Sequence, residues 1–484
     1  MNKHRTRPVR QAAGLDQRPM KAQCVKRMLI GLGLAMALAV PWASATNYYV
    51  VTSSQQPAPT PPWTNWGWAH TNLIEVVAAA RDNDTLYVTN NATYNLTNQI
   101  IVSYAITVRS WGPGGILDPT NTILSGNGNY PNATNRHFTL NNYGATLAGF
   151  TLKNGCESNG GAIWLKSGMV TNCTIVSNVA YNLSTYYGGG GVYMNTSSGG
   201  VWNCVFSGNT SSNSGGGICI KGGGPFRIAD CIIYGNSGLA LGGGIIANPA
   251  AAGTIFNNCW VISNYAKTYG GGIYLLSSAQ CHNSLIMGNT CGINEGGGVR
   301  MGDSSLLRNC LVVGNIATNS SDGGVYLNWN ASIKNCTIAS NVAYGSGGGL
   351  GFLGAYGNNG HPSVENTIIW GNSSAGTGVS NYYIYATNTA ESCVAFTNCS
   401  TSPNIVSIYA SDINTISNNP RYVNDATGDF RLQSDSPCID AGVNRGWMEG
   451  ALDFYGNRRI DNFRKTVDIG AYEFLAKGTV FGFQ

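Results

Sequence analysis

Apolar and polar positions alternate in short phrases that recur from about residue 160 to residue 372. One phrase follows a run of glycines, as in Gly-Ile-Tyr-Leu at residues 272–275, and a second begins with a cysteine, as in Cys-Thr-Ile-Val at residues 173–176. Alternation with a period of two is typical of β-strands that bury one face. An asparagine closes the second phrase at intervals of 25 to 31 residues, which indicates a solenoid with loops inserted into a fixed unit. The closing asparagines are Asn178, Asn209, Asn236, Asn264, Asn289, Asn315, Asn341 and Asn372.

The glycine content excludes a helical repeat. Most copies carry consecutive glycines, as at residues 189–191, and every glycine would cost a helix roughly 0.5–1 kcal/mol relative to alanine. We expect three strands per coil, the third represented by Met169-Val170, with coils about 4.8 Å apart and paired in parallel. Parallel crossovers wind right-handed. The sequence therefore predicts an all-β fold, a single-stranded right-handed parallel β-helix with roughly eight regular coils.

A second column of asparagines precedes the cysteine phrase, and Asp230 replaces one member. Asparagine tolerates the left-handed backbone region and can bond its own turn, so each of these residues is predicted to make a sharp bend. Stacked side chains in this column would also form a ladder of amide hydrogen bonds. The column consists of Asn172, Asn203, Asn258, Asn283, Asn309, Asn335 and Asn366.

Six of the 14 cysteines occupy one position of the repeat, next to that column. Their alternation with apolar residues points them into the bore. Stacking places their Cβ atoms about 4.8 Å apart, beyond the usual range of a disulfide, so we expect buried thiols and neither bridges nor metal ligands. After the repeat, Cys393 and Cys399 could form a small surface disulfide. The six are Cys173, Cys204, Cys231, Cys259, Cys310 and Cys336.

The first 45 residues contain the segments of a secretory signal peptide in their usual order. Basic residues precede an apolar run at residues 28–40, and Ala43-Ser44-Ala45 follows as a small-residue cleavage site. Translation starts at Met1 or at Met20 in this interpretation, and Cys24 lies before the apolar run, where no lipoprotein acylation site forms. The sequence therefore predicts an exported bacterial protein, secreted or held at the cell surface.

Removal of that segment changes the charge. The full chain is formally +5, from 27 basic and 22 acidic residues, but eight of the basic residues and one acidic residue lie before Thr46. The mature chain therefore has 19 basic and 21 acidic residues and a net charge of −2. Nucleic acid is not favoured as a partner, and no segment after residue 45 resembles a transmembrane helix. We expect a monomer.

Residues 46–148 are predicted to form the N-terminal cap and the first irregular rungs. An amphipathic helix at residues 69–80 would cover the first coil, because bare strand edges and an apolar bore invite association. Regular coils are expected over residues 149–400. Nine acidic residues then gather between residues 421 and 473, and residues 401–475 are predicted to be a separate module or an end-cap. Residues 476–484 form a tail that carries no hydrophobic anchor.

Two families are similar to parts of this sequence. The glycine and asparagine phrases resemble the secreted right-handed parallel β-helix family of pectate lyases, polygalacturonases and adhesins, and also the repeats of polymorphic outer-membrane proteins. That resemblance implies either a passive surface module or an enzyme that cleaves polysaccharides. The C-terminal module is similar to the choice-of-anchor Q domain, which implies a position behind a β-helix in a bacterial surface protein. The phrases that carry this second likeness are Gly428-Asp429-Phe430-Arg431-Leu432, Ser436-Pro437-Cys438-Ile439-Asp440 and Val467-Asp468-Ile469-Gly470-Ala471-Tyr472-Glu473.

Candidate catalytic chemistry is sparse. Lyases of this fold need an acidic calcium cluster with a basic proton acceptor, and hydrolases need close carboxylates, but the repeat holds only six acids. Stacking brings Glu295, Arg300, Asp303 and Asp322 to one outer face, as a catalytic site or as a solvated ion-pair cluster. Calcium is left open as a cofactor of the C-terminal acids, although aspartates beside glycine and asparagine are typical of turns.

The first strand of each coil also has an outward position between its two inward residues, and four copies place an aromatic ring there. Such rings stack against sugars, which predicts a carbohydrate-binding surface; the alternative is that they pack on one another or beneath a loop. With only 10% charged residues, the sequence favours a non-catalytic, adhesin-like protein that engages a polysaccharide or surface glycan. The alternative is an extracellular polysaccharide lyase or glycoside hydrolase. The four rings belong to Trp164, Tyr193, Tyr274 and Tyr326.

Overall fold

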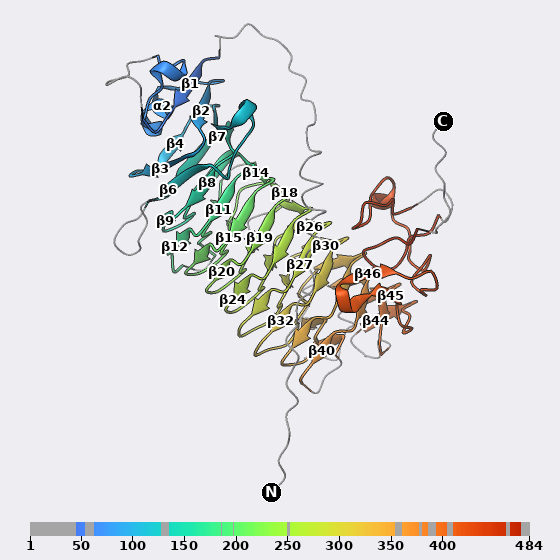
Figure 1. Ribbon diagram of the computed structural model, residues 1–484. Coiled ribbons are helices and arrows are strands. Elements are labelled where there is room, and N and C mark those ends of the chain that lie inside the picture. The colour runs from blue at the N-terminus through green and yellow to red at the C-terminus, as the bar shows by residue number, and fades with distance from the viewer. Residues whose placement is uncertain are drawn as a thin grey trace, which may run out of the picture.

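Parallel strands stack coil upon coil into one elongated all-β solenoid (Figure 1). The computed structural model describes residues 45–53, 62–126, 135–184, 186–196, 198–248, 252–353, 361–376, 380–385, 394–403, 410–460 and 465–475. Apart from Ala45, the expected signal peptide lies outside these residues, together with Cys24 and the alternative start at Met20. The tail at residues 476–484 lies outside them as well.

Each regular coil contains four strands, one more than expected. In one coil these are β13 (Val192–Met194), β14 (Gly199–Trp202), β15 (Val205–Ser207) and β16 (Thr210–Ser211). Each strand pairs in parallel with its counterpart one coil away. The first two strands of the coils join a 23-stranded sheet, the third a 12-stranded sheet and the fourth a 9-stranded sheet. The fourth strand has only two residues, too few to show a period of two in the sequence.

The predicted bends are confirmed at the first asparagine column. Asn172 has a φ of 51°, and Asp230, which replaces an asparagine, has a φ of 54°. At the second bend the left-handed residue is instead the one before the closing asparagine, such as Ser177 with a φ of 55°. The closing asparagine itself turns inward: Asn209 is buried and donates from Nδ2 to Oδ1 of Asn236 in the next coil at 2.9 Å.

The cysteine column lies in the bore, as predicted. All six thiols are free and at most 2% exposed, and they belong to the main hydrophobic core. The backbone N–H of Cys173 donates to Sγ of Cys204 at 3.4 Å, so the thiols also accept hydrogen bonds along the axis. The suggested Cys393–Cys399 disulfide falls partly outside the described residues, since Cys393 is not among them. Cys399 is a buried free thiol and therefore does not lie on the surface.

A short helix covers the N-terminal end of the bore. Helix α2 (Leu73–Ala79) buries Leu73, Val76 and Val77 in the main core. Asn72 caps its first turn by accepting from the N–H of Ile74 at 3.0 Å, so the helix is shorter than the expected residues 69–80. It contacts β1 (Asn47–Val50) and β4 (Ile100–Val102) of the first rungs. Among the described residues, no helix has the length and apolar character needed to cross a bilayer.

The C-terminal module packs along the side of the solenoid, whereas we expected a cap or a separate unit. Strand β44 (Ala410–Ile413) pairs in parallel with β42 (Val394–Thr397) and extends the coil stack. The hairpin of β45 (Tyr422–Asn424) and β46 (Asp429–Leu432) then lies beside the coils (Figure 1). Apolar side chains of this module cover outward residues of the 12-stranded sheet. The buried cluster they form consists of Leu285, Met287, Leu311, Val313, Ala339 and Ile368 from the coils and of Tyr422, Phe430, Leu432, Cys438, Ile469, Ala471 and Tyr472 from the module.

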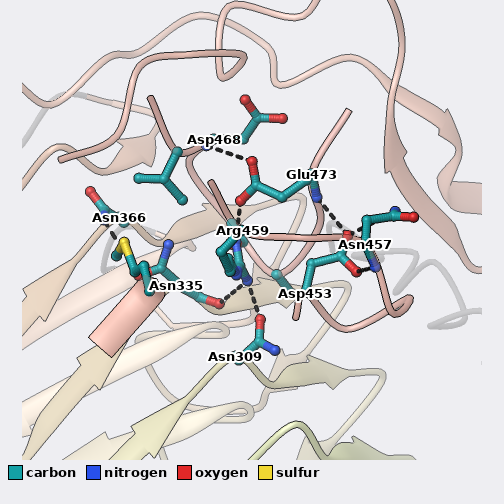
Figure 2. Close-up of polar contacts among 12 residues, drawn as sticks. Asn309, Asn335, Asn366, Asp453, Asn457, Arg459, Asp468 and Glu473 are labelled. Carbon is teal, nitrogen blue, oxygen red and sulfur yellow. Dashed lines mark hydrogen bonds and ion pairs between the residues drawn. The ribbon is translucent and has the colours of Figure 1, made fainter. Parts of the chain in front are cut away.

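One buried arginine fixes the module to the coils (Figure 2). Arg459 donates to Oε1 of Glu473 at 2.7 Å and to the carbonyl of Gly470 at 2.9 Å, both within the module. Its other terminal nitrogen donates to Oδ1 of Asn309, a member of the first asparagine column. The guanidinium and the Glu473 carboxylate are both buried, so the ion pair sits in the contact between the two parts.

Candidate functional site

The predicted outward column is in register along the coils. Trp164 pairs with Tyr193 on the next coil, and Tyr274 pairs with Arg300, which pairs in turn with Tyr326. These residues lie on β10 (Ile163–Thr171), β13, β25 (Ile273–Leu275), β29 (Val299–Met301) and β33 (Val325–Leu327).

Three of the four rings are nevertheless covered, which corrects the expectation of an open aromatic surface. Tyr193, Tyr274 and Tyr326 are 2%, 5% and 5% exposed. Rings from the loops before the first strands lie over two of them: Tyr187 stacks on Tyr193 with centroids 6.1 Å apart, and Tyr269 stacks on Tyr274 at 6.3 Å. Only Trp164 is half-buried, and Lys166 lies 4.3 Å from its ring centroid. The alternative to a carbohydrate-binding surface, in which the rings pack on one another or beneath a loop, therefore holds for the three tyrosines.

Arg300 is the centre of the proposed catalytic group. Its guanidinium carbon lies 4.5 Å, 4.8 Å and 5.4 Å from the ring centroids of Tyr269, Tyr274 and Tyr326. It also donates to the hydroxyl of Tyr274, whose pKa burial raises to about 12. A cation held between three rings is stabilised by their quadrupoles and by the loss of competing water.

The three acids lie around this arginine in different settings. Asp303 follows β29, is half-buried and has a φ of 49°; burial raises the pKa of its carboxyl, although the Arg300 charge opposes the rise. Asp322 is fully buried, and a Cβ on Gly351 of the next coil would lie only 1.6 Å from its Oδ1. Asp322 and the half-buried Glu295 both raise the pKa of Tyr326, so they lie close to that ring. The structure thus places Asp303 near Arg300, and Glu295 and Asp322 near Tyr326, on neighbouring coils.

A shallow open depression of about 440 Å³ adjoins Asp303. It is lined by Asp303, Ser304, Trp329 and Asn330, from the turns that follow β29 and β33. Trp329 is 38% exposed and has a φ of 47°. The sequence analysis missed Trp329. Its signal was available: in the two preceding coils this turn carries small polar residues, Ser277-Ser278 and Asp303-Ser304, so a large ring between Asn328 and Asn330 is out of pattern.

Among the nine C-terminal acids that prompted the calcium alternative, Asp453 and Asp468 accept backbone hydrogen bonds within the module. Asp453 accepts from the N–H groups of Tyr455 at 2.8 Å, Asn457 at 2.7 Å and Glu473 at 2.8 Å. Asp468 accepts from the N–H groups of Asp440 and Phe474. Within the ranges that the structure describes, no three His, Cys, Asp or Glu residues converge in a way that could hold a metal ion.

Comparison with known proteins agrees with this architecture. Residues 138–341 match the family model described as a right handed beta helix region. The chain is an all-β parallel solenoid, consistent with a right-handed β-helix. Among curated proteins, none matches this sequence.

Three solved structures are similar to this chain at low sequence identity. Pectate lyase Pel9A is 15% identical, with a TM-score of 0.45 over 89% of this chain and 97% of that one. The Dettilon tailspike protein is 13% identical, with a TM-score of 0.40 over 76% and 68%. The A-module of mannuronan C-5 epimerase AlgE4 from Azotobacter vinelandii is 12% identical, with a TM-score of 0.36 over 71% and 88%.

Proposed function

We propose that this β-helix is an exported, non-catalytic protein that binds carbohydrate at the Trp329 depression, meaning the surface lined by Asp303, Ser304, Trp329 and Asn330. The exposed indole of Trp329 beside these polar side chains is the observation that carries the proposal. Sugar rings present apolar faces and a rim of hydroxyl groups, so a site for them combines an aromatic plane with hydrogen-bonding groups.

The indole is held in place from below. A Cβ on Gly302 would lie 2.8 Å from the Trp329 ring and 3.0 Å from Leu276, so the ring packs closely over the backbone of the preceding coil. A ring fixed in this way loses little conformational freedom on binding, which favours affinity. The outward face of the ring is then available to a ligand.

Polar groups surround the ring on two successive coils. The carboxylate of Asp303 accepts hydrogen bonds, the amide of Asn330 donates and accepts, and the hydroxyl of Ser304 does both. Asn330 and Ser304 are exposed, so sugar hydroxyls can reach these groups in place of water. Because the depression is open and shallow, we expect weak binding to one or two sugar units of a longer glycan.

Replacement of Trp329 by alanine tests this site. We expect Trp329→Ala to weaken retention on a bound polysaccharide by about tenfold, since loss of one stacked ring costs about 1.4 kcal/mol. Tyr344→Ala is the matched control, because Tyr344 is also exposed, at 49%, and lies away from the depression. Affinity electrophoresis across a panel of neutral and acidic polysaccharides measures the effect. Equal retention of wild type and Trp329→Ala on every retained glycan would remove the proposal.

A second candidate function, cleavage of a polysaccharide by a lyase or hydrolase, is favoured by one observation: the raised pKa of Asp303 next to Arg300. A carboxyl with a raised pKa beside a binding surface is a candidate acid or base. Reducing-end and unsaturated-product assays on the same panel decide between the two functions. Product that disappears in Asp303→Asn while binding persists would establish catalysis; no product with retained binding would support the non-catalytic function.

A further inference from the structure

A row of polar side chains runs along the outer surface of the second strands of the coils, away from the Trp329 depression. His282, Arg308, Lys334 and Glu365 occupy the same position on β26 (Gln280–His282), β30 (Leu306–Arg308), β34 (Ser332–Lys334) and β38 (Ser363–Glu365). They are in register on four successive coils. Side chains at paired positions of neighbouring strands lie close enough to interact.

The C-terminal module crosses this row with the segment that contains η4 (Gly446–Met448). At one end, Arg445 donates from Nε at 2.9 Å and from a terminal nitrogen at 2.6 Å to Oε2 of Glu365. At the other end, the Trp447 ring centroid lies 4.5 Å from the guanidinium carbon of Arg308. Lys334 lies on the strand between Glu365 and Arg308, so the segment passes over it.

The charges beneath this segment do not balance. Arg308 contacts His282 and the Trp447 ring, and neither is an anion. The backbone carbonyl of Lys334 accepts from the N–H of Asn309, but its side-chain ammonium makes no hydrogen bond or ion pair within the described part of the chain. Glu365 already pairs with Arg445. Two adjacent cations on neighbouring strands repel each other, and a bound anion would relieve that repulsion.

Two hydrogen-bond donors beside these cations also lack acceptors. Arg308 donates to Nδ1 of His282 at 3.1 Å, so the neutral imidazole carries its proton on Nε2. That Nε2 and the indole Nε1 of Trp447 are buried without a hydrogen-bond partner. Burial and the charges of Arg308 and Arg227 lower the pKa of His282 to about 4, so the ring is a neutral donor at pH 7. Buried donors that lack acceptors favour binding of an acceptor.

We propose that Arg308 and Lys334, together with the Trp447 indole, form a binding site for an oxyanion where the C-terminal module crosses the coils. Its ligand is a sulfate, phosphate or carboxylate group, either a free ion or a substituent on an acidic sugar. Guanidinium and ammonium groups bind such oxygens through charge-assisted hydrogen bonds, and an anion that displaced the Trp447 segment slightly would reach the two buried donors. Since Arg445 and Trp447 come from the module, a bound anion would also strengthen the contact between the module and the coils.

Titration calorimetry tests the site with inorganic sulfate, inorganic phosphate and galacturonate as separate probes, with glucose as the neutral control. We expect Lys334→Gln to raise the Kd for the bound anion at least tenfold, and Lys267→Gln, which removes the same charge from an exposed position elsewhere, to leave it unchanged. Tighter binding of galacturonate than of either inorganic ion would identify an acidic sugar as the ligand. Tighter binding of an inorganic ion would identify a free anion.

The indole N–H resonance of Trp447, assigned by its loss in Trp447→Phe, gives a second measurement on the wild-type protein. We expect this resonance to move on addition of the anion that binds and to remain fixed with glucose. No measurable binding of any of the three anions, or binding that is equal in wild type and Lys334→Gln, would overturn the proposal. So would a Trp447 resonance that no anion moves.

Discussion

At the scale of single residues, the closing asparagines show how a polar side chain can stabilise an apolar bore. Oδ1 of Asn289 accepts from the backbone N–H of Asn264 at 2.9 Å and from its Nδ2 at 3.0 Å. Nδ2 of Asn289 donates to the carbonyl of Val261 and to Oδ1 of Asn315. Each closing asparagine therefore links three coils through hydrogen bonds, and all donors and acceptors of its buried side-chain amide have partners.

Loss of one side-chain amide from this asparagine column should strongly destabilise the folded protein. We expect Asn289→Leu to lower the free energy of unfolding by at least about 3 kcal/mol, because several buried groups of the neighbouring coils lose their partners at once. Asn258→Gly, at a half-exposed member of the first column, should cost under about 1 kcal/mol, because glycine keeps the left-handed bend there. Urea unfolding of both variants measures the difference. Equal costs would contradict the assigned role of the inner column.

His137 gives a prediction about pH. It is fully buried, its Nε2 donates to the carbonyl of Lys153 at 3.0 Å, and burial lowers its pKa from 6.5 to about 4. Between these values the unfolded chain binds a proton that the folded chain does not, so stability should fall as the pH drops from about 6.5 toward 4. The contribution is up to about 3 kcal/mol. His137→Gln, which keeps a donor for Lys153, should flatten this part of the stability curve when urea unfolding is followed between about pH 4 and pH 7.

At the scale of elements, the glycine runs form the bend before each first strand. Gly270 opens one run with a φ of 63°, and the next glycine, Gly271, lies against the neighbouring coil, where a Cβ would be 2.3 Å from the carbonyl oxygen of Gly297. The first position needs left-handed backbone, and the second needs the absence of a side chain. Asp322 takes the first position in one coil with a φ of 67°, since aspartate also tolerates that region.

Alanine substitutions at two different glycines separate the requirement for left-handed backbone from the requirement for the absence of a side chain. Gly271→Ala should destabilise the protein by about 3 kcal/mol or more, because the new methyl group meets backbone atoms that cannot move aside. Gly235→Ala should cost only about 1 kcal/mol: its φ of 60° is strained for alanine, but no atom lies within 4 Å of the added Cβ. Thermal unfolding compares the two, and a larger loss for Gly235→Ala would show that backbone conformation outweighs close packing.

At the scale of the whole molecule, the C-terminal module and the coils share one hydrophobic cluster along the 12-stranded sheet. The Arg459–Glu473 pair adds a polar anchor to that contact, and Figure 2 shows Arg459 pointing toward Asn309 and Glu473. A buried ion pair adds little net stability over apolar packing, but removal of one partner leaves an uncompensated charge. The module is therefore expected to detach when this arginine is lost.

Arg459→Leu should weaken docking of the module by about 3–5 kcal/mol. Hydrogen exchange should then become faster at residues 465–475 and stay slow in the coils at residues 149–176. The double variant Arg459→Leu with Glu473→Gln should recover part of the protection, because it removes the unpaired charge. Uniformly faster exchange along the whole chain would mean that the module and the coils unfold together.

The sequence by itself determined the coil stack, because its chemistry is periodic. Alternating apolar residues, bend asparagines such as Asn172 and inward thiols such as Cys204 repeat in most coils, and stacking places like residues together. It also placed Arg300 next to Tyr274 and Tyr326, since register follows from the repeat. Only the tertiary structure decided which outward positions are covered. A loop covers Tyr193, the module lies beside the coils, and Trp447 contacts Arg308. These contacts form between segments that the sequence repeat does not relate to each other.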